Sequence, residues 1–307
     1  MTEPHRREFA FLVNPVAGGG AGPKVVVPVA RALREAGCDV EVRYTAAASE
    51  VPDLVRAAVD RDAVVVSVGG DGMLSSVAGD VADAGGLLGL VPAGRGNDFA
   101  RALGVPDDPA AVVDLLLHGT PTAVDLLDVT DADGTRAVAG SVYTGVDARA
   151  AAIVDRSRWL PDRLQYPVAA VAALATYRPV QIRIELDGRV SEHRAATVVV
   201  ANSAYYGKGM RIAPPATLDD GQLDVVVIEA AGRADLVRSL PKVYDGSHID
   251  LDEVHVLRGR RVRLSGAFVG GAPTPVGADG EPLSALAPTP DAPLEVAIRP
   301  GALRVLG

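Results

Sequence analysis

Apolar and polar residues along the first third of the chain fall into blocks that predict strands and helices in turn. Short apolar runs of strand type lie at 9–13, 38–44, 63–68 and 87–91. Segments of helical character lie between them, at about 23–36, 49–60 and 73–83. Strands that alternate with helices in this way are typical of a mostly parallel sheet covered by helices.

Polar, glycine-rich segments follow three of these strands, at 14–20, 69–72 and 92–98. The carboxyl ends of parallel strands meet at one edge of a sheet, where helix N-termini and backbone N–H groups converge. We therefore expect the three loops to lie together and to form one ligand-binding site.

The pattern changes at about residue 123. Strand-type runs follow at 124–130, 137–143, 180–186, 196–202, 223–229, 254–257 and 262–264. Asp133-Gly134 and Asp187-Gly188 are strong hairpin signals, and a helix is expected at about 164–177. We predict an α/β domain over 1–122, completed by residues 294–307, and a second, mainly antiparallel β domain over 123–293.

Composition narrows the functional classes. The formal net charge of −9 argues against a nucleic-acid partner, which needs a basic stripe to neutralise its phosphates. Cys38 is the only cysteine, so an intrachain disulfide and a cysteine-rich metal centre are excluded. The five histidines are scattered, and none lies at zinc-ligand spacing from another. One basic cluster is either a solvated strand face or a membrane contact; it consists of Arg258, Arg260, Arg261 and Arg263.

The sequence carries no strong targeting or membrane signal. The apolar run at 9–13 is too short for a signal-peptide core, and no apolar run approaches the roughly 20 residues that span a bilayer. We expect a cytoplasmic protein that is at most peripherally associated with a membrane. The segment around Trp159 either packs on the sheet or meets lipid.

The three loops contain residues suited to phosphate and metal chemistry. The glycines of 14–20 let backbone N–H groups approach an anion, although Pro23 excludes both a Walker A loop and G-x-G-x-x-G. In 69–72, Asp71 either positions a metal ion or its water beside phosphate oxygens, or belongs to a plain turn. In 92–98, Arg95 either contacts phosphate or points to solvent, and Asp98 is expected to cap the following helix.

These loops, in this order and spacing, resemble the diacylglycerol kinase catalytic-domain family, which includes bacterial diacylglycerol kinases and sphingosine kinases. The resemblance runs from Phe11 to about Val305. It implies an NAD kinase-like first domain and transfer of phosphate from ATP to a lipid hydroxyl. The nucleotide-binding residues that it implies are Asn14, Pro15, Gly18, Thr45, Gly69, Gly70, Asp71, Gly72, Gly94, Arg95 and Asn97.

Later motifs agree with the resemblance. The segment 213–224 is similar to the family's Mg²⁺-binding segment, which implies Asp220 as a side-chain ligand and Thr217 and Gln222 as carbonyl ligands. Taken alone, this segment would be a turn before a strand. Asp125 matches an Asp of the family's metal and water network, or is merely a polar residue at a strand end. Glu281, in an Asp-Gly-Glu motif, is implied to be the general base, with Asp71 as the second catalytic residue.

Two departures leave other functions open. Met73 and Arg95 stand where the family usually has hydroxyl-bearing residues, which makes a non-catalytic nucleotide or lipid sensor conceivable. An NAD kinase is the alternative enzyme, because its first domain is similar, but the third loop and Glu281 favour a lipid kinase. The expected partner is a lipid substrate at a membrane surface, and open strand edges in the second domain would allow a homodimer.

Overall fold

The computed structural model describes residues 7–15, 20, 22–45, 48–94, 96–146, 148, 173 and 177–307. Gly18, Arg95, the segment around Trp159 and most of the helix predicted at 164–177 lie outside the described residues. The chain divides into two units. Unit 1 comprises Met1–Leu126, Leu218–Asp220 and Arg299–Gly307, and unit 2 comprises Leu127–Thr217 and Gly221–Ile298.

Unit 1 is built on a parallel sheet in the strand order β4-β3-β1-β2. Its strands are β1 (Glu8–Val13), β2 (Asp39–Tyr44), β3 (Val64–Gly69) and β4 (Leu87–Pro92). β1 and β3 are almost wholly buried, as expected for parallel strands covered on both faces, which explains their continuous apolar runs. The end of β15 (Leu294–Leu306) pairs with β4 in parallel, and β5 (Pro121–Asp131) pairs with β15.

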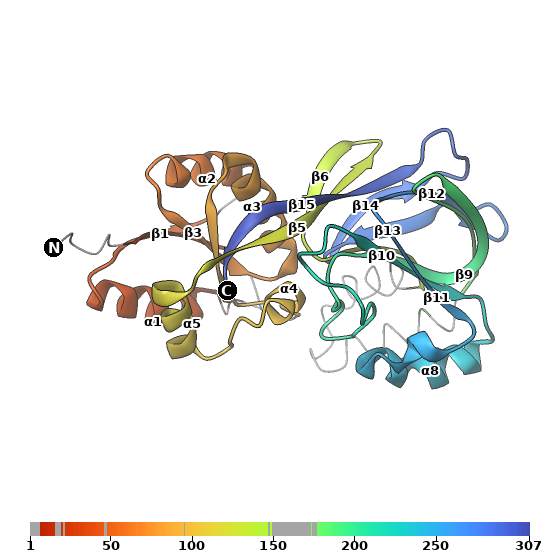
Figure 1. Ribbon diagram of the computed structural model, residues 1–307, viewed down its shortest axis with the longest axis horizontal. Helices are drawn as coiled ribbons and strands as arrows, with labels where there is room; N and C mark the ends of the chain where they lie inside the picture. Colours follow the sequence, from red (N-terminus) through yellow and green to blue (C-terminus); the bar gives the residue numbers. More distant parts are fainter. Residues whose placement is uncertain are drawn as a thin grey trace. The chain divides into compact units, whose positions relative to one another are not determined.

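Helices cover both faces of this sheet. Figure 1 shows α1 (Gly22–Glu35) and α5 (Pro109–His118) on one face, and α2 (Val51–Val59) and α3 (Asp71–Ala84) on the other. α1 buries Val26, Val29 and Leu33 at helical spacing against the sheet. The short helices η2 (Ala48–Glu50) and α4 (Asp98–Ala102) complete the unit.

Unit 2 is mainly antiparallel. The strand order is β14-β13-β7-β9-β8-β12-β15, and β10 pairs with β9 and β11. The strands are β6 (Gly134–Val138), β7 (Ser141–Gly145), β8 (Val180–Leu186), β9 (Arg189–Ala201), β10 (Leu223–Glu229), β11 (Val254–Gly259), β12 (Arg261–Phe268), β13 (Thr274–Ala278) and β14 (Glu281–Leu286). Its described helices are α8 (Arg233–Asp245) and η3 (Ser247–Asp250).

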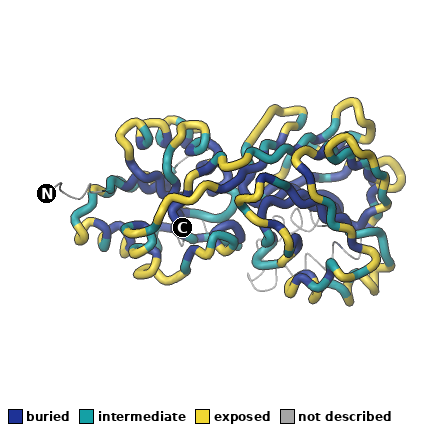
Figure 2. The backbone as a smooth tube through the Cα atoms, in the orientation of Figure 1, coloured by how far each residue is buried: buried dark blue, intermediate teal, exposed yellow. Residues whose placement is uncertain are grey.

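The predicted fold class is confirmed: a parallel α/β unit precedes an antiparallel β unit. Both predicted hairpins form, because Asp131 pairs with Gly134 and Leu186 pairs with Arg189. Buried residues follow the strands in each unit, whereas exposed residues mark hairpin tips and outer helix faces (Figure 2). Among the described residues, no helix combines the length and apolar character needed to cross a bilayer.

Candidate functional site

The three glycine-rich loops of unit 1 begin side by side. In the parallel register, Val13 lies beside Val68, and Gly69 lies beside Pro92. The N–H of Asn14 donates to the Val68 carbonyl at 3.1 Å, which ties the start of the first loop to β3. Thus the loops at 14–20, 69–72 and 92–98 leave the same edge of the sheet, as the sequence predicts.

The second and third loops touch backbone to backbone. A Cβ added to Gly94 would stand 2.4 Å from the Gly70 Cα, a distance that no real side chain tolerates. The Ala93 N–H donates to the Gly69 carbonyl at 3.0 Å. Glycine is therefore required at Gly94 by close approach, and the two loops form one continuous backbone surface.

Asn97 closes the third loop on itself. Its Oδ1 accepts from the Gly94 N–H at 2.9 Å, and its Nδ2 donates to the Gly94 carbonyl at 3.3 Å. Asn97 has a φ of +53°, a left-handed conformation that asparagine adopts more readily than most residues. The amide thus has a structural task in shaping the loop that is predicted to bind nucleotide.

Asp71 joins the second loop to the third. It is the first residue of α3, and its Oδ1 accepts from the Phe99 N–H at 3.3 Å. The prediction that Asp98 caps the following helix is wrong, because Asp98 is the first residue of α4 and no side chain of the preceding residue caps this helix. The side chain of Asn97 is hydrogen-bonded to Gly94. The Phe99 N–H donates instead to the carboxylate of Asp71, which belongs to the second loop.

Two carboxylates flank Gly96. A Cβ added there would stand 2.8 Å from Asp71 Oδ2 and 3.2 Å from Asp98 Oδ2. Asp98 is only 6% exposed. Two carboxylates therefore lie beside the backbone of the third loop.

The other residues predicted to bind nucleotide border these loops. Thr45 follows β2 and donates to the Val13 carbonyl through both its N–H, at 3.0 Å, and its hydroxyl, at 3.2 Å. Pro15 is exposed in the turn after β1, and Gly72 is the second residue of α3. Met73 lies over Gly69, with its Sδ 3.1 Å from where a Cβ of Gly69 would stand.

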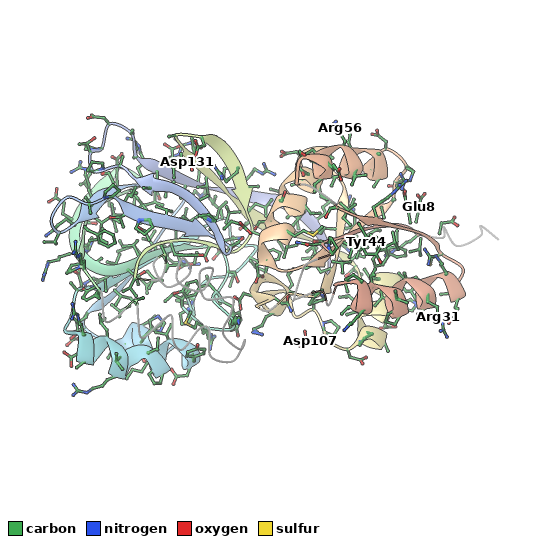
Figure 3. All side chains as sticks on the ribbon, turned by 180° about the vertical axis from the view of Figure 1, so that it is seen from behind. Glu8, Arg31, Tyr44, Arg56, Asp107 and Asp131 are labelled. Carbon is green, nitrogen blue, oxygen red and sulfur yellow. The ribbon has the colours of Figure 1, made fainter. Side chains whose placement is uncertain are left out.

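An apolar groove beside β2 was not anticipated from the sequence. It has a volume of about 600 Å³ and lies between α1 and β2, lined by Val26, Val27, Ala30, Arg31, Arg34, Glu35, Val42 and Tyr44. Figure 3 labels Arg31 on α1 and Tyr44 at the end of β2. Tyr44 immediately precedes Thr45, so the groove adjoins one of the predicted nucleotide-binding positions. Periodicity marks the buried side of α1 but does not reveal a space beside it.

Asp125 ties together three distant parts of the chain within unit 1. It lies on β5 with 2% of its surface exposed. Its N–H donates to the Leu218 carbonyl at 2.6 Å, and its Oδ1 accepts from the Gly301 N–H at 2.7 Å. One carboxylate oxygen is therefore engaged with backbone, which gives this predicted metal-network residue a structural role.

The remaining predicted metal ligands lie in the turn before β10. Asp220 is exposed, and Gly221 after it has a φ of +67°. Asp220 belongs to unit 1, whereas Thr217 and Gln222 belong to unit 2. Among the described residues, no group of three or more His, Cys, Asp or Glu side chains is arranged to hold a metal ion.

Glu281, the predicted base, lies in unit 2. It is the first residue of β14 and is exposed. It follows the turn Asp279-Gly280 and pairs with Ala278 across the hairpin. The side chain thus stands at one end of the antiparallel sheet, next to a tight turn.

The basic cluster at 258–263 is largely neutralised by acidic partners. Arg258 Nε lies 3.1 Å from Oδ1 of the buried Asp224. Arg261 and Arg263 both lie near Glu295, at 3.5 and 3.8 Å. These pairs favour a surface of balanced charge on the sheet over a basic membrane contact.

The structure brings together two histidines that are far apart in the sequence. His193 Nδ1 lies 2.7 Å from Glu229 Oε1, and His255 Nε2 lies 3.7 Å from the same oxygen. His193 Nε2 lies 2.9 Å from the Ser191 hydroxyl. The order β9-β10-β11 creates this cluster, so residue spacing along the chain could not have indicated it.

Comparison with known proteins gives matches over nearly the whole chain. Residues 8–129 match the diacylglycerol kinase catalytic domain, and residues 140–307 match the YegS C-terminal NAD kinase beta sandwich-like domain. The chain is 34% identical over 302 residues to a diacylglycerol kinase of Mycobacterium tuberculosis, with 96% of this chain and 93% of the relative covered. A diacylglycerol kinase of Bacillus subtilis is 24% identical, with 83% and 84% covered. A crystal structure of a diacylglycerol kinase from Bacillus anthracis shares the fold, with a TM-score of 0.71 at 19% identity, covering 99% of this chain and 98% of that one.

Proposed function

The chain belongs to the diacylglycerol kinase catalytic-domain family and is an ATP-dependent lipid kinase, and we propose that its acceptor is the hydroxyl of a diacylglycerol-like lipid. The choice of a diacylglycerol-like acceptor rests on one observation. The similarity to the M. tuberculosis relative extends over 96% of the chain, so it includes both the glycine-rich loops and the hairpin of Glu281.

The loops of unit 1 are the proposed phosphate site. The contact between Gly70 and Gly94 brings two loops close enough for their N–H groups to face a common anion. α3 begins at Asp71 without a side-chain cap, and the positive end of its dipole favours a phosphate there. Asn14 and Asn97 border this surface, and Asp71 keeps the second and third loops together.

Mg²⁺ is the proposed cofactor of the turn at 217–222. The donors available are hard oxygens, namely the Asp220 carboxylate and the carbonyls of Thr217 and Gln222, which suits Mg²⁺. Asp125 holds the Leu218 carbonyl within this turn. When bound, the ion would order the turn and supply positive charge there.

Glu281 is the proposed general base. Its carboxylate accepts the proton of the lipid hydroxyl as the hydroxyl oxygen forms a bond to the γ-phosphorus. The bond from the γ-phosphorus to the bridging oxygen breaks at the same time, and ADP leaves with that oxygen. An exposed position at the edge of the sheet lets a bulky lipid reach this carboxylate.

The acceptor determines where the enzyme must act. A long-chain lipid resides in a membrane, so we propose transient, peripheral contact with a membrane surface. The homodimer expected from the open edges of the second sheet stays a prediction.

Transfer of labelled γ-phosphate tests the proposal. ATP and Mg²⁺ are incubated with mixed micelles that contain diacylglycerol, phosphatidylglycerol or a sphingoid base, and separately with NAD⁺. We expect label in diacylglycerol. Glu281→Gln should lower the rate by about 10²- to 10⁴-fold with ATP binding unchanged.

Glu192→Gln is a matched control, because Glu192 is also an exposed carboxylate of unit 2, with 78% of its side chain accessible. It should leave transfer unaffected. Label in NAD⁺ alone would contradict the lipid acceptor, and a fully active Glu281→Gln enzyme would contradict the base.

A further inference from the structure

The carboxylate of Asp279 is held by three consecutive backbone N–H groups in unit 2. Its Oδ2 accepts from Ala139 at 3.1 Å and from Gly140 at 2.9 Å, and its Oδ1 accepts from Ser141 at 2.8 Å. Successive N–H groups that converge in this way form a concave anion site. Hydrogen bonds to a charged acceptor are about twice as strong as neutral ones.

The segment that supplies these donors is itself firmly anchored. The N–H groups of Asn202 and Ser203 both donate to the Gly140 carbonyl, at 2.9 and 3.2 Å. The Asn202 Nδ2 donates to the Ala139 carbonyl at 2.8 Å. Ala139, Asn202 and Ser203 are at most 1% exposed, so the donors present a fixed surface to the carboxylate.

Asp279 is also part of the tight turn that leads to Glu281. Asp279 and Gly280 have φ values of +44° and +89°, as in the two-residue hairpin turns that match strand twist. The Asp279 N–H donates to the Ser141 carbonyl at 3.1 Å, which adds a fourth hydrogen bond between the turn and the anchored segment. The hairpin carrying Glu281 is therefore fixed at its tip.

The fit around the carboxylate is close. A Cβ added to Gly140 would stand 2.6 Å from Asp279 Oδ1. Glu281 lies directly after this turn, as the first residue of β14. The turn therefore sets the position of the Glu281 backbone, from which the side chain extends.

We propose that Asp279 is a positioning residue for phosphate transfer. Its carboxylate accepts hydrogen bonds from the backbone of 139–141 and so holds the hairpin in the position from which Glu281 reaches the substrate hydroxyl. This inference rests on the proposed role of Glu281 as the base. A displacement of about 1 Å can cost on the order of 10²-fold in rate, so a small shift of the turn suffices to impair the reaction.

Two variants disturb the same contact from opposite sides. Asp279→Asn keeps a residue that favours this turn but replaces one acceptor oxygen by an NH₂ group facing backbone N–H donors. Gly140→Ala places a methyl group against Asp279 Oδ1. Each should lower kcat by about 10- to 100-fold with the KM for ATP within about twofold. The double variant should be no slower than the slower single variant, because both break one interaction.

Asp187→Asn is the matched control. Asp187 has a φ of +49° before Gly188 in the β8–β9 hairpin, and its Oδ1 accepts from the N–H of Arg261 at 2.9 Å. Its Oδ2 accepts from the N–H of Arg260 at 3.0 Å. As in the hairpin of Asp279, the turn has two residues with positive φ, and its Asp carboxylate accepts hydrogen bonds from backbone N–H groups. The β8–β9 hairpin carries no proposed catalytic group, so kcat should stay unchanged.

Hydrogen exchange provides a readout besides activity. The amides of Ala139, Gly140 and Ser141 should exchange faster in Asp279→Asn than in the parent protein. If Asp279→Asn retains the parent kcat while Glu281→Gln is inactive, the positioning role is refuted and the base assignment stands. If Glu281→Gln is fully active, the base assignment fails first, and the positioning role fails with it.

Discussion

Replacing Gly94 by alanine tests whether contact between the second and third loops is needed for nucleotide binding. The added Cβ would lie 2.4 Å from the Gly70 Cα, 2.8 Å from Asn97 Oδ1 and 3.1 Å from the Gly70 nitrogen. Two non-bonded carbons pack best at about 3.5 Å or more. The loops must therefore separate by about 1 Å, and backbone on the Gly70 side cannot rotate away as a side chain could.

The expected loss of catalytic efficiency in Gly94→Ala follows from this separation of the loops. A shift of about 1 Å in a positioning element costs on the order of 10²-fold in rate, or about 2.7 kcal/mol of transition-state stabilisation. Overpacking lowers the free energy of unfolding by about 1–3 kcal/mol. We expect Gly94→Ala to lower kcat/KM for ATP by about 100-fold while the protein stays folded.

Steady-state kinetics with varied ATP measure kcat/KM, and urea denaturation measures the free energy of unfolding. Gly85→Ala is the control: Gly85 ends α3 with a φ of +70°, and an added Cβ meets no atom within 4 Å. That variant should lose about 1–2 kcal/mol of stability through backbone strain, without a change in kinetics. A Gly94→Ala enzyme with the parent kcat/KM for ATP would show that nucleotide binding does not depend on the close contact between the two loops.

Asp125→Ala should lower the free energy of unfolding by about 1–3 kcal/mol in urea, because the Gly301 N–H loses its acceptor; an unchanged midpoint would contradict this. Burial lowers the pKa of His248 from 6.5, so the unfolded chain binds this proton more readily than the folded protein. Stability should therefore fall below about pH 6.5, by at most about 1.4 kcal/mol per pH unit. His248→Gln, whose amide can still donate to the Ile212 carbonyl, should remove this contribution, and equal slopes in both proteins would argue against it. EDTA should abolish transfer, and Asp220→Ala should raise the Mg²⁺ concentration for half-maximal activity by at least about tenfold; an unaltered Mg²⁺ dependence would exclude Asp220 as a ligand.

The sequence was sufficient to predict features that depend on local chain properties. Buried strands such as β3 can be recognised in the sequence as continuous apolar runs, because both faces of a parallel strand are covered. Asp187-Gly188 specifies its hairpin because a tight turn of this kind needs two residues with positive φ. The glycine-rich loops could be placed at one edge of a sheet, because parallel strands all end there.

Which side chains and backbone groups come into contact depends on how these elements pack in three dimensions. The sequence predicts Asp98 as the cap of α4, yet Asp98 is the first residue of that helix, and the Phe99 N–H donates to Asp71 of another loop. The hydrogen bonds from the backbone N–H groups of 139–141 to the Asp279 carboxylate join residues about 140 positions apart. Such contacts depend on strand order and register, which bring distant segments within hydrogen-bonding range, and neither periodicity nor local turn preference contains that information.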